Sequence, residues 1–162
     1  MNTKVKTEKM KHVFYPDWLV IIITILGLVG ITSMIYYIIS SNNIYWRVFT
    51  ALVVVLLLYF IFKVPLWVRV EEESIQVKQL IGSIKITNIE TITKFNKKEF
   101  NQTIRTFGNG GLGGYVGYFS SPGIGKFYMA AVNKNELAKI TTKEGKIYVI
   151  NYPNHLLNRE SE

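Results

Sequence analysis

Two long runs of apolar residues dominate the first 62 positions of the chain. Residues 18–39 carry no charged side chain, and residues 44–62 carry only Arg47. Each run is close to the ~20 residues that a helix needs to cross the hydrocarbon core of a bilayer. Because only positions 40–43 separate the two runs, the pattern predicts a membrane helical hairpin.

After position 62 the apolar pattern changes to a period of two. Apolar and polar side chains alternate from Leu66 onward, which is typical of β-strands with one buried face. Turn-forming residues at 71–74 and 143–145 predict two hairpins. Seven short strands are expected, over residues 66–71, 75–78, 83–95, 100–107, 126–132, 137–142 and 146–152. The chain after the hairpin is therefore mainly β, a small antiparallel barrel or sandwich, and only residues 153–162 permit a helix.

Basic residues flank the hairpin mainly on one side. Four lysines precede the first run, and Lys63, Arg69 and Lys78 follow the second. Lysine and arginine are enriched in cytoplasmic segments next to membrane helices, so both termini are expected in the cytoplasm. The predicted organisation is a basic cytoplasmic N-terminus at 1–17, a transmembrane helix at 18–39, an external loop at 40–43, a second transmembrane helix at 44–62, a β domain at 63–152 and a tail or short helix at 153–162.

A signal peptide in the first run and a buried site at Arg47 are the alternatives to this organisation. A signal peptide has an apolar core of 7–15 residues and a small-residue cleavage site, whereas the first run is longer and lacks such a site. Arg47 lies near the outer end of the second run, which favours a side chain that reaches the headgroups over one that serves a buried site. Small residues on one face of the first helix predict close contact with the second helix. They are Thr24, Gly27, Gly30 and Ser33.

Composition and charge narrow the chemistry of the chain. Its 162 residues include no cysteine, two histidines and a single aspartate, Asp17, and the formal net charge is +8. A disulfide framework is excluded, and neither a nucleophile with a base nor a cluster of metal ligands is apparent. The positive charge is spread along the chain without an aromatic–basic motif, which argues against nucleic-acid binding. We therefore expect no catalytic residue, no cofactor and no metal site.

Residues 105–125 contain eight of the twelve glycines in the chain. A Gly-x-Gly-x-x-Gly spacing that starts at Gly108 fits the dinucleotide-binding fingerprint, but the residues up to Pro122 cannot form the helix that this motif requires. A Walker A loop is excluded because Phe127, not serine or threonine, follows the Gly-Lys pair. Two interpretations stay open, namely a bulged or mobile connection between strands and a loop that contacts a partner.

If residues 105–125 form a loop that contacts a partner, their side chains are expected to differ in whether they pack into the barrel or face the partner. Phe107 is expected to pack into the barrel at the end of its strand, whereas Tyr115, Tyr118 and Phe119 are expected to face the partner. The candidate contact residues are Arg105, Gly108, Gly110, Gly111, Gly113, Gly114, Tyr115, Gly117, Tyr118 and Phe119.

The order of motifs in the β region resembles a known family. Four isoleucines are spaced as Ile84-x-Ile86-x-x-Ile89-x-x-Ile92, and they are followed by Arg105-x-Phe107-Gly108, by Gly-Gly-Tyr-x-Gly at 113–117 and by Tyr148-Val149-Ile150. This order is similar to the bacterial pleckstrin-homology-like (PH-like) domains found behind paired membrane helices, over about residues 68–152. The resemblance implies a seven-stranded, strongly bent antiparallel barrel closed by a short C-terminal helix, in a protein of the bacterial inner membrane. It implies little about activity.

Three classes of function are consistent with these features. The first is a non-enzymatic binding or scaffolding module that engages a protein partner at the cytoplasmic face, through the glycine-rich loop or by strand addition. The second is a weak reader of anionic lipid surfaces, with Lys94, Lys97, Lys98 and Arg105 attracted diffusely to the membrane. Here an acidic turn at 71–73 replaces the basic turn of PH domains that bind phosphoinositides. The third is a membrane enzyme, for which the sequence offers no catalytic group.

Overall fold

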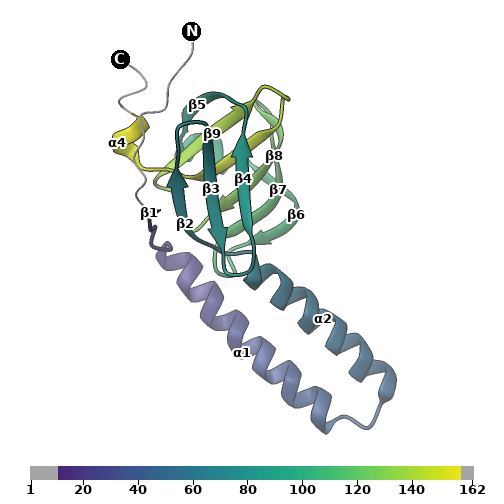
Figure 1. Cartoon of the computed structure of the whole chain (residues 1–162). Helices are drawn as coiled ribbons and strands as arrows, with labels where there is room; N and C mark the ends of the chain where they lie inside the picture. Colours follow the sequence, from purple (N-terminus) through teal and green to yellow (C-terminus); the bar gives the residue numbers. More distant parts are fainter. Residues whose placement is uncertain (1–10, 158–162) are drawn as a thin grey trace.

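The computed structural model describes residues 11–157 and shows a helical hairpin joined to one end of a β domain (Figure 1). Helix α1 spans Trp18–Ser40 and helix α2 spans Ile44–Phe62. Few side chains are buried in the most apolar stretch of each helix, 11% in α1 and 6% in α2. Core helices of water-soluble proteins are mostly buried, so these apolar surfaces suit contact with lipid. The predicted hairpin of two long apolar helices is confirmed.

The short connection between the helices has a local explanation. Asn43 is the N-cap of α2, and its side-chain oxygen accepts hydrogen bonds from the backbone N–H groups of Tyr45 at 3.1 Å and Trp46 at 3.4 Å. These bonds satisfy two of the N–H groups that a helix start leaves without partners. The chain can therefore reverse direction within three residues.

A four-stranded antiparallel sheet forms one layer of the β domain, in the order β1–β2–β3–β4. Its strands are β1 (Lys11–His12), β2 (Pro65–Val70), β3 (Ser74–Gln79) and β4 (Ser83–Thr87). Strand β1 precedes α1 in the chain, yet it pairs with β2, with Lys11 opposite Arg69. The sequence pattern does not predict this pairing. It places the segment before α1 beside the β domain, on the same side of the hairpin.

A six-stranded sheet forms the second layer, in the order β5–β9–β10–β8–β7–β6. Its strands are β5 (Ile89–Phe95), β6 (Ile104–Gly110), β7 (Tyr115–Ser121), β8 (Gly125–Ala131), β9 (Leu137–Thr142) and β10 (Ile147–Asn151). Strands β8 and β10 run parallel, with Tyr148 opposite Tyr128, and the other neighbours are antiparallel. The short helix α4 (Asn154–Leu157) follows β10.

The mainly-β domain with a short C-terminal helix is confirmed, although its details differ from seven antiparallel strands. Residues 83–95 form two strands because the chain turns at Asn88, whose φ is +54°. The glycine-rich segment supplies a further strand, β7, so that β2–β10 make nine strands. The parallel pairing of β8 with β10 depends on how the whole sheet is arranged, and no local sequence pattern predicts it. The predicted tail beyond position 157 and the basic residues before position 11 lie outside the described residues.

Helix α3 (Lys97–Asn101) corrects the prediction of a strand over residues 100–107. The Asn96 side chain accepts a hydrogen bond from the Glu99 N–H at 3.0 Å, and the Glu99 carboxylate accepts one from the Asn96 N–H at 2.8 Å. This reciprocal capping box stabilises the start of a helical turn. Strand β6 consequently begins only at Ile104, and the prediction that only residues 153–162 permit a helix is wrong.

Each face of the six-stranded sheet carries a buried cluster of side chains. One face packs against the four-stranded sheet and α4, in a cluster of Val68, Val70, Ile75, Val77, Ile86, Ala130, Ala138, Ile140, Ile150, Tyr152, Leu156 and Leu157. The other face carries a cluster that includes Phe95, Phe119 and Phe127, and Val20 of α1 belongs to it. The first turn of α1 is therefore part of the core of the β domain.

Candidate functional site

The glycine-rich segment forms a hairpin of β6 and β7. Gly108 lies opposite Gly117, and the register shifts between Arg105 and Phe107, which marks a bulge. The φ angles of the two glycines are +129° and +134°, and a Cβ on Gly117 would lie 2.7 Å from the Cα of Gly108. Backbones this close leave no room for a side chain, so glycine is required at both positions.

The turn between these strands packs against helix α1. We call residues 109–114 the glycine turn. A Cβ on Gly111 would lie 2.8 Å from Cδ1 of Ile23, and a Cβ on Gly27 would overlap the Leu112 side chain. The small-residue face of α1 thus receives the glycine turn at Thr24 and Gly27, a contact that the sequence does not predict.

Hydrogen bonds within the chain satisfy the backbone groups of the glycine turn. The Gly111 N–H donates to the Gly114 carbonyl at 2.9 Å, and the Leu112 N–H donates to Oδ1 of Asn109 at 2.8 Å. The amide of Asn109 also donates to the Leu112 carbonyl. The Gly113 N–H donates to the Thr24 hydroxyl of α1 at 2.7 Å. Irregular backbone survives beside membrane helices only when its polar groups have partners in the protein, and this turn meets that condition.

Replacing Thr24 by valine should loosen the turn from the helix. Valine keeps the shape but leaves the partly buried Gly113 N–H without an acceptor, at a cost of about 1–3 kcal/mol. Hydrogen–deuterium exchange at the Gly113 amide should then be faster by roughly 5- to 150-fold, at about tenfold per 1.4 kcal/mol. Ser33→Ala is the control, because the Ser33 hydroxyl bonds only the Val29 carbonyl within α1, at 3.0 Å. Equal exchange rates in both variants would contradict this role of Thr24.

A second contact fixes the start of α1 to the β domain. The Asp17 carboxylate accepts hydrogen bonds from the Lys134 N–H at 2.9 Å and from the Asn135 amide at 3.4 Å. The Asn133 amide donates to the Tyr15 carbonyl at 2.9 Å, and Asn133 in turn accepts from Asn151 of β10 at 2.9 Å. The sole aspartate of the chain is therefore a structural anchor between the membrane helix and the β8–β9 loop.

The side chains that were predicted to contact a partner lie on both faces of the six-stranded sheet. Tyr115 and Phe119 are buried in the aromatic cluster, so the prediction that their side chains face a partner is wrong. Phe107 is 61% exposed and its ring lies 5.9 Å from that of Phe60 in α2, so the prediction that it packs into the barrel is also wrong. Tyr118 and Arg105 are exposed, as a contact surface requires.

Tyr115 illustrates the environment of the buried aromatic residues. Its ring lies 5.1 Å from that of Phe100, and the Lys134 ammonium lies 5.3 Å from its centroid. Burial, helped by the negative charge of Asp17, raises the pKa of Tyr115 to about 12. The phenol therefore stays protonated at neutral pH and cannot act as a base there.

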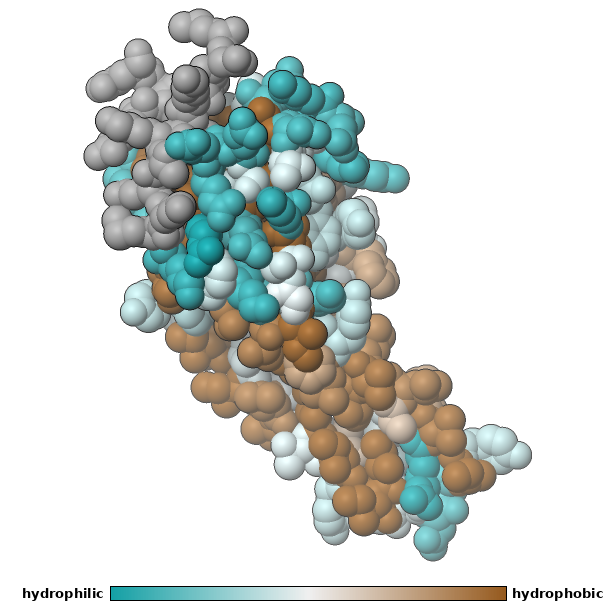
Figure 2. All heavy atoms as spheres, in the orientation of Figure 1, coloured by the Kyte–Doolittle hydropathy of each residue, from teal (hydrophilic) through white to brown (hydrophobic). Residues whose placement is uncertain are grey.

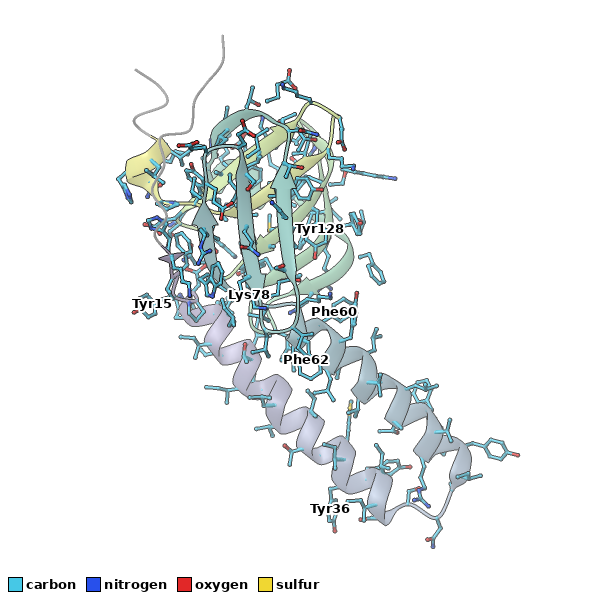
Figure 3. All side chains as sticks on the ribbon, in the orientation of Figure 1. Tyr15, Tyr36, Phe60, Phe62, Lys78 and Tyr128 are labelled. Carbon is cyan, nitrogen blue, oxygen red and sulfur yellow. The ribbon has the colours of Figure 1, made fainter. Side chains whose placement is uncertain are left out.

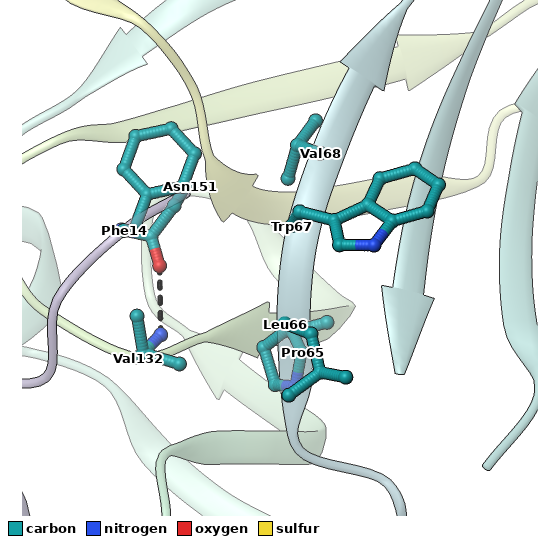
Figure 4. A pocket seen from close by; sticks show the side chains of 8 residues that line it. Phe14, Pro65, Leu66, Trp67, Val68, Val132 and Asn151 are labelled. Carbon is teal, nitrogen blue, oxygen red and sulfur yellow. Dashed lines mark hydrogen bonds between the residues drawn. The ribbon is translucent and has the colours of Figure 1, made fainter. Parts of the chain in front are cut away.

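The described residues line a small pocket and a larger, open depression. One, lined by Phe14, Trp67, Val132 and Asn151 among others, has a volume of about 10 Å³, enough for one water molecule (Figure 4). The hydrogen bond from the Val132 N–H to Oδ1 of Asn151 joins two residues that line this pocket. A shallow, open depression near the termini brings together His12, Glu136 and His155. Within residues 11–157, no group of three histidine, cysteine or acidic side chains is arranged to hold a metal ion.

Sequence reasoning missed the residues that attach the helices to the β domain. Thr24 and Asp17 form the hydrogen bonds that join α1 to the β domain. Within the β domain, Asn109 and Asn151 bind the backbone of the segments that receive these bonds. Buried amide and hydroxyl groups are costly unless they are paired, so an Asn or Thr within an apolar run is the one local signal that points to such contacts.

The family model described as bacterial PH domain matches residues 66–155. The match begins one residue into β2 and ends within α4, so it covers the β domain and leaves out the hairpin. Comparisons with curated proteins and with solved structures give no match.

Proposed function

Because the chain belongs to the bacterial PH domain family, we propose that it is a non-enzymatic binding module anchored in the membrane by helices α1 and α2. PH domains are typically binding modules for proteins or lipids and not catalysts. Two attachments, the glycine turn on α1 and the Asp17 contact, support a scaffolding role, because they hold the β domain in one place against the hairpin.

The proposed contact with a protein partner is made by the edge strand β6. It stands at the end of the six-stranded sheet and pairs only with β7 among the described strands. Such an edge offers backbone donors and acceptors to an extended segment of another protein. Ile104 on this strand is 71% exposed, and Arg105 and Tyr118 lie exposed beside it. We propose that these side chains and the β6 backbone bind a partner protein, while the glycine turn positions the edge.

The proposed contact is tested in cells with a photo-crosslinking amino acid at Ile104 of the full chain. We expect a discrete protein adduct, because an extended partner segment would lie against this side chain. The matched control carries the same amino acid at Glu90, an exposed residue of β5 at the opposite edge of the same sheet. No adduct at Ile104, or equal adducts at both edges, would exclude β6 as the binding edge.

We further propose that the protein lies in the bacterial inner membrane with both termini in the cytoplasm. The lysine and arginine bias supports this orientation, and the pairing of β1 with β2 is consistent with an even number of crossings. Alkaline phosphatase fused after Glu162 should be inactive, and the same enzyme inserted at residues 40–43 should be active, because it folds only outside the cytoplasm. The reverse result would overturn the orientation.

A further inference from the structure

The turn between β3 and β4 exposes two large apolar side chains at the end of the β domain that meets the helices. Leu80 is 48% exposed and Ile81 is 56% exposed. The Leu80 N–H donates to the Val64 carbonyl at 3.0 Å, and the Ile81 N–H donates to the Phe62 carbonyl at 2.9 Å. Phe62 is the last residue of α2, so the turn lies directly beside the end of that helix.

The length of α2 sets the level of this turn relative to a bilayer. Its 19 residues rise ~1.5 Å each and span roughly 28 Å, which barely covers the ~30 Å hydrocarbon core. When Ile44 lies at the outer boundary of the hydrocarbon core, the helix is too short for Phe62 to extend beyond the opposite boundary into water. Leu80 and Ile81 must therefore lie at the edge of the hydrocarbon when α2 spans the membrane.

The β domain cannot lift the turn away without breaking contacts. The Gln79 amide donates to the Lys63 carbonyl at 2.7 Å, directly after α2. On the other helix, the glycine turn reaches Gly27, which is nine residues, or roughly 13 Å, past the start of α1. Both helices thus hold the same end of the β domain close to the membrane.

The surroundings of the turn have the chemistry of a membrane interface. Phe62 and Leu66 are also exposed apolar residues, and Figure 2 shows apolar surface running from the helices onto the adjoining end of the β domain. Lys63 lies 5.6 Å over the Tyr59 ring, and Figure 3 shows Lys78 near the same end. Apolar side chains rimmed by lysine and tyrosine are typical of surfaces that sit in the headgroup region.

We propose that the β3–β4 turn is a lipid-contact site, in which Leu80 and Ile81 insert into the leaflet beside α2 and touch acyl chains. The occupant is lipid because the turn continues the lipid-facing surface of a membrane helix at the same depth. This contact differs from capture of a lipid headgroup at residues 71–73, since that turn lies at the opposite end of β3. It requires no protein partner and does not rest on the binding role of β6.

The absence of native cysteine allows a clean test with the full chain. Leu80→Cys and Ile81→Cys are each labelled with an environment-sensitive NBD fluorophore and reconstituted in vesicles of phosphatidylcholine and phosphatidylglycerol. Glu73→Cys is the matched control, because it lies in the turn at the other end of β3, roughly 20 Å away at ~3.3 Å per residue. Lipids with a nitroxide on the acyl chain are added as quenchers.

Labels at Leu80 and Ile81 should emit at shorter wavelength than the label at Glu73 and should be quenched by the nitroxide lipids. The label at Glu73 should emit as in water and escape quenching. Using two neighbouring positions guards against local disturbance by either label. Emission and quenching at both positions equal to those at Glu73 would overturn the proposal, because the turn would then lie in water.

Discussion

Phe119→Ala should lower the free energy of unfolding of the β domain by about 3–5 kcal/mol, the usual cost of a buried aromatic side chain. Phe119 is only 4% exposed, and its ring stacks on Phe127 at 6.2 Å with an interplanar angle of 20°. Phe127 in turn contacts Phe95 at 5.8 Å. The truncation therefore opens a cavity in the middle of the aromatic cluster. Denaturant unfolding of the full chain in detergent, followed by near-ultraviolet circular dichroism, measures the loss.

Tyr118→Ala is the matched control for this prediction. Tyr118 is the next residue on β7 and points to the opposite face of the sheet, where it is 55% exposed and contacts Tyr128 at 5.3 Å. Losing this partial contact should cost no more than about 1.5 kcal/mol. If Phe119→Ala were as mild as Tyr118→Ala, Phe119 would not belong to the core and its burial would have to be reconsidered.

Gly117→Ala should destabilise the β6–β7 hairpin by about 2–6 kcal/mol, the sum of backbone strain and steric overlap. The φ of +134° at this position is unfavourable for any residue with a Cβ. The added methyl group would also meet the carbonyl of Phe107 and the Cα of Gly108, which are backbone atoms of the neighbouring strand. Backbone cannot rotate aside as a flexible side chain does, so the two strands must separate. The same unfolding measurement detects the effect.

Gly123→Ala provides the comparison within the same glycine-rich segment. Apart from Gly123 and its two chain neighbours, no described residue has a heavy atom within 4 Å of the position that a Cβ would take there. The change should alter the free energy of unfolding by less than about 0.5 kcal/mol. A large loss in both variants would mean that flexibility, and not close approach of the strands, explains the glycines.

The bulge in β6 explains why the faces of the aromatic residues were assigned incorrectly from sequence. Alternation along a strand decides which side chains point inward, and one extra residue inverts that alternation for everything beyond it. The register shift between Arg105 and Phe107 has this effect and leaves Phe107 outside. On β7 apolar or aromatic side chains lie on both faces, with the buried Tyr115 and Phe119 on one face and the exposed Tyr118 on the other. The strand therefore lacks the apolar–polar alternation that would have shown their direction.

The local sequence pattern was sufficient to predict the helices and hairpins, because their formation depends on residues that are close together in the chain. A run of about 20 apolar residues can satisfy its backbone in a bilayer only as a helix, and period-two segments separated by turn residues form hairpins. The helices α1 and α2, the β2–β3 and β9–β10 hairpins and the mainly-β class follow from these rules.

The attachment of the β domain to the membrane helices was decided only by the tertiary structure. Thr24 and Gly113 are 89 positions apart, and Asp17 and Lys134 are 117 apart, so their hydrogen bonds form only when the six-stranded sheet packs beside α1. The local sequences around the Thr24 hydroxyl and around Gly113 do not indicate that the two residues pair. Their pairing follows from the need to satisfy buried polar groups once folding has brought the two segments together.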